Sequence, residues 1–279
     1  MVWTFLIFLA LIWLVVASIS DLRKREVPNW LNFSLVAFAL SFRAFYSILN
    51  EEPRFFIFGL FGFFLFFILA HLFYYSRIFA GGDAKLLMGL GAVLPLPTTI
   101  QENFFIISLF IFLFLLLGSF YGLIYSSVLA LKNRKKFAEE FKKQIKLKRT
   151  LINFGLLFFL ISLILVFYLN EMILLFFPAI FLLFPLLLIY GKAVEESCMV
   201  KKIWGREATV GDWLYEEIKI GRKKFKPSWE GLNEREVKIL RKYKKKIKIK
   251  VGIPFVPVFL FAFLFLFIFK DKFLWLLGF

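Results

Sequence analysis

The sequence predicts an all-α polytopic membrane protein with about seven to eight transmembrane helices and a small cytoplasmic domain before the last helix. Composition is the first indication of this fold class. Hydrophobic residues make up 61% of the 279 residues, and aromatic residues make up 21%, including 42 Phe. Soluble domains are much less apolar. The second indication is that apolar runs of about 20 residues, the length with which a helix crosses the hydrocarbon core, recur along the chain.

The predicted helices follow the apolar runs in order. We expect long spans near residues 2–20, 30–49, 55–76, 103–131, 151–169, 172–191 and 253–269, and a shorter segment near 84–97. The first run is expected to stay as a helix rather than to be a cleaved signal peptide. No basic region precedes it, and no small-x-small cleavage pattern follows it.

Positive charge is distributed unevenly and predicts the orientation of the chain. If the N-terminus lies outside and each segment crosses once, the inside loops are 21–29, 77–85, 132–150 and 192–252. These loops hold 32 of the 36 Lys and Arg residues, as the positive-inside rule predicts. Membrane topology therefore explains the net charge of +17, and we expect the lipid bilayer, and no nucleic acid, as a partner. The exceptions are Arg43, Arg54, Lys270 and Lys272.

The chain is expected to divide into five regions. These are a transmembrane core at 1–131, a basic cytoplasmic linker at 132–150, an extra transmembrane helix pair at 151–191, a cytoplasmic domain at 192–252 and a C-terminal transmembrane helix at 253–279. The basic linker is expected to extend the preceding span as a helix. Within the cytoplasmic domain, Asn233 and Glu236 have the spacing of a capping box, and the alternation at 247–251 predicts a strand.

Two of the four aspartates, Asp21 and Asp83, lie where apolar runs meet short polar turns. A carboxylate at membrane depth is costly to keep ionised, so such a residue usually has a function. Both fall on the predicted inner side, where they can meet. Two carboxylates within a few Å of each other share one proton. One then activates water while the other donates a proton to the scissile carbonyl, as in aspartic proteases.

Other interpretations of the two aspartates stay open. Asp83 follows two glycines and is suited to be the N-cap of the next helix. An ion or proton transporter also uses intramembrane carboxylates, although transporters commonly have two related halves and the strings around the two aspartates differ. A non-catalytic membrane assembly protein would use both as caps and turn residues. With one His and one Cys, the chain is not expected to hold a metal or another cofactor.

The strings around the two aspartates resemble a known family. Asp21 is followed by Arg23, Arg25 and Val27-Pro28-Asn29, and the string Gly81-Gly82-Asp83-x-Lys85 comes later in the chain. These strings resemble the archaeal type IV prepilin and preflagellin peptidases, which are GxGD-type intramembrane aspartyl proteases of peptidase family A24. The string Gly89-Leu90-Gly91-Ala92 also fits that family, and residues 252–257 resemble the C-terminal part of its archaeal branch.

The resemblance implies an aspartic endopeptidase at the cytoplasmic face of the cell membrane. It would remove the short basic leader of prepilin or preflagellin-like precursors, which carry class III signal peptides. Asp21 and Asp83 would be catalytic, and Gly81, Gly82 and Lys85 would support the catalytic loop.

Three further expectations accompany the resemblance. Glu26 is a possible leader-binding residue, because its carboxylate can attract the basic side chains of the leader. Bacterial members carry a cysteine-rich zinc loop and an N-methyltransferase activity; that loop is missing here, so we expect cleavage without methylation. Ala80 stands where the motif has glycine, and alanine resists a positive φ angle. The oligomeric state is not predicted.

Overall fold

The computed structural model describes residues 2–95, 99–220 and 223–276, without the side chains of residues 2, 3, 271 and 273–276. The predicted ends of the 84–97 segment and of the 253–279 segment therefore lie outside the described residues. The chain forms two compact units, one made of residues 1–123 with 253–279 and the other of residues 124–252.

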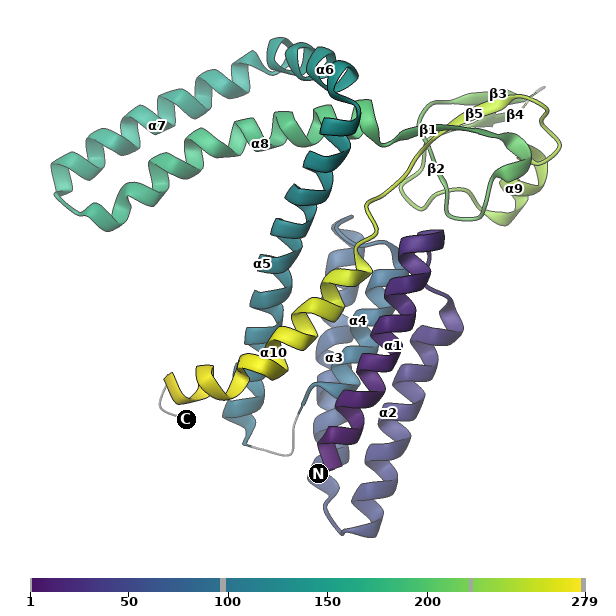
Figure 1. Ribbon diagram of the computed structural model, residues 1–279, viewed down its shortest axis with the longest axis vertical. Coiled ribbons are helices and arrows are strands. Elements are labelled where there is room, and N and C mark those ends of the chain that lie inside the picture. Colours follow the sequence, from purple (N-terminus) through teal and green to yellow (C-terminus); the bar gives the residue numbers. More distant parts are fainter. Residues whose placement is uncertain (1, 96–98, 221–222, 277–279) are drawn as a thin grey trace. The chain divides into compact units, whose positions relative to one another are not determined.

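The first unit is a bundle of apolar helices (Figure 1). It consists of α1 (Val2–Lys24), α2 (Asn29–Leu49), α3 (Pro53–Tyr75), α4 (Gly81–Val93), the first part of α5 (Ile100–Lys132) and α10 (Val256–Leu276). The short helix α4 contacts α1, α2 and α3, and eight of its 13 residues are buried. Apolar residues on all sides are typical of such an enclosed helix.

Close contact between α3 and α4 depends on glycines. A Cβ atom added to Gly91 of α4 would lie 2.6 Å from the carbonyl oxygen of Gly62 and 2.5 Å from the Cβ of Phe66. Small residues allow helix backbones to approach in this way within a membrane. The aromatic rings of Phe110 and Phe114 in α5 complete the core, in contact with α3 and α10.

Six helices in the described part of the chain are long and apolar enough to cross a membrane. The all-α polytopic fold class is therefore confirmed, and the protein is a multi-pass membrane protein, but the expected count of seven to eight spans is too high. With 13 residues, α4 is about 20 Å long, which is shorter than the hydrocarbon core of about 30 Å. The described apolar part of α10, Val256–Lys270, is also short.

The second unit starts with the end of α5 and continues through α6 (Arg134–Leu147), α7 (Arg149–Leu169), the 3-10 turn η1 (Met172–Leu175) and α8 (Phe176–Cys198). α7 and α8 form a hairpin of two apolar helices (Figure 1), with Gly155 packed against Pro185. α6 does not continue the preceding span as expected. The backbone breaks at Asn133, where φ is −116° and ψ is 32°. This break allows Phe137 of α6 to contact the ring of Tyr190 in α8.

A small β-containing domain follows α8. Its elements are β1 (Val200–Trp204), η2 (Gly205–Glu207), β2 (Trp213–Leu214), β3 (Ile218–Ile220), β4 (Lys223–Phe225), α9 (Glu234–Leu240) and β5 (Lys246–Lys250). β5 lies between β1 and β2 and is antiparallel to both, whereas β3 pairs with β4. The strand predicted near 247–251 is thus confirmed as β5. The predicted capping box is confirmed too: Asn233 and Glu236 each accept a hydrogen bond from the backbone N–H of the other.

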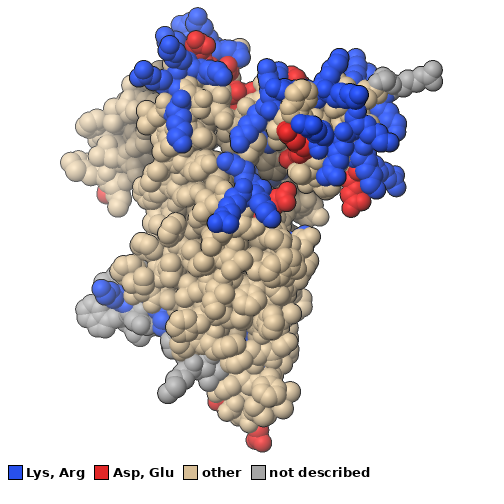
Figure 2. All heavy atoms as spheres, turned by 45° about the vertical axis from the view of Figure 1, so that its right-hand side comes forward, with Lys and Arg blue, Asp and Glu red and all other residues tan. Residues whose placement is uncertain are grey.

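Charged side chains connect this domain to the end of α8. Lys192 lies 2.9 Å from both Glu195 and Glu196, and Lys250 of β5 pairs with Glu195. The hydroxyl of Tyr215 donates to Glu196 at 2.5 Å, and this bond raises the pKa of Tyr215. In Figure 2 the Lys and Arg side chains gather over α6 and the β-containing domain, which agrees with the basic segments of the sequence.

Candidate active site

Asp21 lies in the last turn of α1, and only 7% of its surface is exposed. The helix ends where Arg25 adopts the left-handed region at φ 58° and its N–H donates to the carbonyl of Asp21 at 2.8 Å. The carboxylate oxygen Oδ2 of Asp21 accepts a hydrogen bond of 2.9 Å from the backbone N–H of Val256, the first residue of α10. Asp21 therefore caps the start of the last helix.

Asp83 lies in the first turn of α4 and is half-buried. The N-cap of this helix is Ala80, and no side chain caps it. The interpretation of Asp83 as the N-cap is therefore wrong; Asp83 is the third residue of the helix, and its carboxyl group is hydrogen-bonded to the backbone of Ala80. At φ −73° and ψ 161°, Ala80 has an extended backbone that any L-residue adopts. Alanine in place of the motif glycine thus causes no backbone strain here.

The structure brings the two aspartates together from separate helices. α1 contacts α4, and the charge of Asp21 acts on the carboxyl group of Asp83. Among the described residues, no hydrogen bond joins the two carboxyl groups directly. Two acidic groups on contacting helices, one at the end of α1 and one at the start of α4, can act as an acid and a base on a molecule held between them.

The connection between α1 and α2 lies against the start of α4. Val27 is buried, and a Cβ atom added to Gly82 would lie 3.5 Å from the Cβ of Val27, an ordinary contact distance. Gly81 and Gly82 belong to the first helical turn of α4, so the expected catalytic loop is part of a helix. Lys85 donates a hydrogen bond of 2.8 Å to Asn29 Oδ1, whereas Glu26 is exposed.

Asn32 is a residue of this site that sequence reasoning missed. It is fully buried in α2, and its side-chain nitrogen donates to the carbonyl oxygen of Gly82 at 3.3 Å. Its side-chain oxygen has no hydrogen-bond donor among the described residues. The sequence does contain a sign of its role: Asn32 comes three residues after Asn29, and residues at this spacing share one face of a helix. Asn29 and Asn32 both reach the start of α4 from that face.

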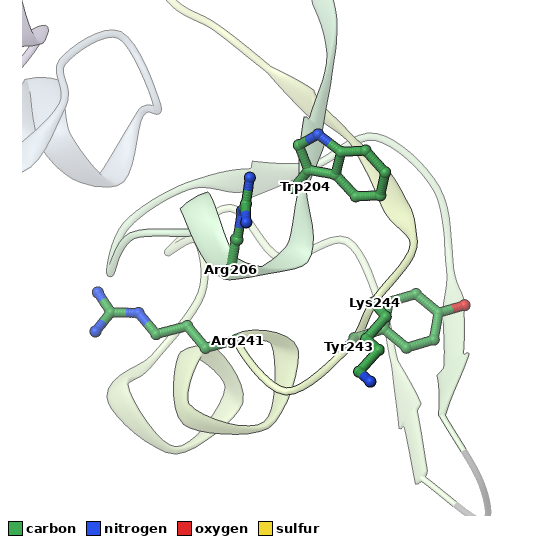
Figure 3. Close-up of a pocket in the computed structure, with 5 residues that line it drawn as sticks. All are labelled: Trp204, Arg206, Arg241, Tyr243 and Lys244. Atoms are coloured by element: carbon green, nitrogen blue, oxygen red, sulfur yellow. The ribbon is translucent and has the colours of Figure 1, made fainter.

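A separate pocket lies in the β-containing domain (Figure 3). It has a volume of about 310 Å³ and is lined by Trp204, Arg206, Arg241, Tyr243 and Lys244. Three of these side chains are cationic, and none is a carboxylate. The pocket therefore has no pair of acidic groups of the kind that Asp21 and Asp83 provide.

Comparisons with known proteins find similarity to one group of peptidases. Residues 8–127 match the Type IV leader peptidase family. The chain is similar to preflagellin peptidases of Methanocaldococcus jannaschii (35% identical over 82 residues), Methanococcus maripaludis (37% over 82) and Methanococcus voltae (34% over 89). These matches cover 29%, 29% and 31% of this chain.

The chain thus spans only 35–37% of the length of these relatives. On this chain, the family match begins within α1, includes α2, α3 and α4, and ends within α5. Residues 8–127, which carry both Asp21 and Asp83, are therefore similar to the Type IV leader peptidase family.

Proposed function

We propose that the protein is a membrane-embedded aspartic endopeptidase that removes the short basic leader of prepilin or preflagellin-like precursors. The observation that carries this proposal is the pairing of Asp21 and Asp83. The two residues come from different helices, the charge of one acts on the other, and both lie within the segment that matches the leader peptidase family. The names of the preflagellin peptidase relatives support the choice of substrate.

The chemistry of the pair follows from one shared proton. The ionised carboxylate takes a proton from a water molecule, and the hydroxide bonds to the carbonyl carbon of the scissile peptide. The protonated carboxyl group gives its proton to the carbonyl oxygen, which produces a neutral tetrahedral intermediate. When the C–N bond breaks, the carboxyl group that took the water proton gives it to the amine nitrogen. The other carboxylate takes a proton from a hydroxyl of the intermediate, so the starting protonation state returns.

The surroundings of the pair suit a substrate with a basic leader. The exposed Glu26 lies next to Val27, the residue that contacts Gly82. We propose that its carboxylate attracts Lys or Arg side chains of the leader. Lys85 and Asn29, which are hydrogen-bonded to each other, hold the α1–α2 connection beside Asp83 and so support the site indirectly.

The proposed orientation places the active site at the cytoplasmic face of the cell membrane. Residues 132–150 and 192–252 are proposed to be cytoplasmic, with the N-terminus outside, because the inside loops then hold 32 of the 36 Lys and Arg residues. This orientation requires that the segment containing α4, although short, returns the chain to the outer side. Residues 1–131 would form the catalytic core, 151–191 an added helix pair and 253–279 the last transmembrane segment. The chain has one cysteine and lacks a cysteine-rich loop, so cleavage without N-methylation is proposed.

The test is to incubate the purified full-length protein, in detergent or liposomes, with precursors that carry class III signal peptides. Mass spectrometry then locates the cut. We expect one cut between the basic leader and the apolar helix. Failure to cut any such precursor, or equal cutting by a protein that lacks both carboxylates, would overturn the proposal.

A further inference from the structure

The C-terminal end of α4 poses a physical problem within a membrane. The helix ends at Val93, and residues Val93, Leu94 and Pro95 are buried. The last carbonyl groups of a helix have no partners within that helix, and lipid offers no water to satisfy them. A short helix that ends at this depth therefore needs donors from elsewhere in the protein.

Arg43 supplies these donors. It is fully buried in α2, about 20 Å along the helix from its start at Asn29. Its Nε donates to the carbonyl of Ala92 at 2.8 Å, and its Nη2 donates to the carbonyls of Val93 at 3.0 Å and of Pro95. Its Nη1 donates to the carbonyl of Phe55 in α3 at 2.8 Å. The rigid fork of N–H groups on arginine is suited to several acceptors at once.

The charge and the space around Arg43 fit the same role. A cation is favourable at the negative C-terminal end of a helix, and the guanidinium carbon lies 4.6 Å from the centre of the Phe55 ring. No acidic side chain pairs with Arg43 within the described residues. Gly59 of α3 leaves room for it, because a Cβ atom at that position would overlap the Cδ of Arg43.

Asp83 stands at the opposite end of the same helix. About 14 Å of rigid helix separates it from the residues that Arg43 holds. The start of α4 has fewer side-chain hydrogen bonds to α2 than its end has. The side chain of Asn32 donates one of 3.3 Å to the carbonyl of Gly82, and Lys85 donates one of 2.8 Å to Asn29, whereas Arg43 donates three at the other end. The end bound by Arg43 is thus the anchored end, and its placement determines the depth and direction of the whole helix.

We propose that Arg43 is a positioning residue for Asp83: it fixes the C-terminal end of α4 and thereby places the carboxyl group of Asp83 opposite Asp21. The inference rests on the proposed protease function, because its first test measures cleavage of a precursor. Arg43 touches no reacting atom in this role. It acts through α4.

The first test compares Arg43→Lys with Arg54→Lys. Lysine keeps the charge of Arg43, but its single ammonium group cannot reach four carbonyl groups in different directions. Arg54 is an exposed arginine at the start of α3 and serves as the control. We expect Arg43→Lys to lower kcat by about tenfold or more with KM within about twofold, because a displaced catalytic group impairs the chemical step. Arg54→Lys should cut at the wild-type rate.

Gly59→Ala is an independent test, because it disturbs the side chain of Arg43 without replacing that residue. The added methyl group overlaps the arginine side chain, so this variant should lower kcat in the same manner as Arg43→Lys. Wild-type cleavage kinetics in both variants would overturn the proposal.

A second test needs no enzymatic activity and separates this proposal from the proposed function. Asp21→Cys and Asp83→Cys are combined in a Cys198→Ser background, and disulfide formation is followed in the monodisperse, folded fraction. Adding Arg43→Lys should change the rate of crosslinking several-fold, whereas adding Arg54→Lys should not. If crosslinking is unchanged and activity falls only in proportion to the folded fraction, Arg43 stabilises the fold without positioning Asp83, and the proposal is wrong.

Discussion

A hydrogen bond of 2.9 Å joins the carboxylate of Asp21 to the backbone N–H of Val256, 235 positions later in the chain. The bond connects the end of α1 to the start of α10 and gives Asp21 a structural role beside its proposed catalytic one. Replacing Asp21 therefore has two separable consequences, one on the stability of the helix contact and one on the chemistry. The choice of substitution distinguishes them.

Asp21→Asn and Asp83→Asn are each expected to lower the cleavage rate by about a thousandfold or more, because each removes one partner of the acid–base pair. In Asp21→Asn, the side-chain oxygen of the introduced asparagine would still accept the Val256 N–H, so this variant should keep the thermal midpoint of the wild type. Asp21→Leu should lose the cap as well, at a cost of about 1 kcal/mol in the free energy of unfolding. Near wild-type cleavage by either asparagine variant would show that the dyad is misassigned.

Asn32→Ala removes the hydrogen bond to the carbonyl of Gly82 and should loosen the start of α4. We expect kcat to fall about fivefold, corresponding to the loss of roughly one hydrogen bond, with little change in KM. The matched control is Asn50→Ala at the exposed end of the same helix, for which we expect no change. Steady-state kinetics on a peptide precursor would measure both, and equal kcat values for the two variants would contradict the role of Asn32.

Gly91→Ala should destabilise the bundle, because the added Cβ would lie 2.5 Å from the Cβ of Phe66. Overpacking of this kind costs about 1–3 kcal/mol. Gly122→Ala in α5 is the control, since no atom lies within 4 Å of the added Cβ and alanine favours a helix more than glycine does. Thermal unfolding in detergent should show a lower midpoint for Gly91→Ala and an unchanged or higher one for Gly122→Ala. A wild-type midpoint for Gly91→Ala would contradict this prediction, because it would mean that α3 and α4 can move apart without a loss in the free energy of unfolding.

The orientation of the chain can be tested by labelling. Ser228→Cys in a Cys198→Ser background places one thiol in the β-containing domain, at an exposed position. A membrane-impermeant maleimide should leave it unlabelled in sealed cells and label it after permeabilisation, because the positive-inside rule places residues 192–252 in the cytoplasm. Labelling of intact cells would reverse the proposed orientation.

The apolar runs of the sequence predict most of the helices, because a chain in lipid must satisfy its backbone within each span and needs a fixed length to cross. The predicted span at 30–49 corresponds to α2 (Asn29–Leu49), and the one at 151–169 to α7 (Arg149–Leu169). Local patterns were equally informative in the β-containing domain, where the capping box of Asn233 and Glu236 formed as predicted. The positions of Asp21 and Asp83 at helix ends also follow from the sequence.

The contacts between distant segments were decided by the tertiary structure alone. Arg43, which in the sequence is only an exception to the charge distribution, binds carbonyl groups at Ala92 and Val93, about fifty positions away. Likewise, the sequence does not show that Asp21 caps α10 or that Asn32 reaches Gly82. The physical reason is that hydropathy and capping patterns report interactions within a turn or a span. The partners of a buried polar group are set by which helices pack together, and that is determined only when the whole bundle forms.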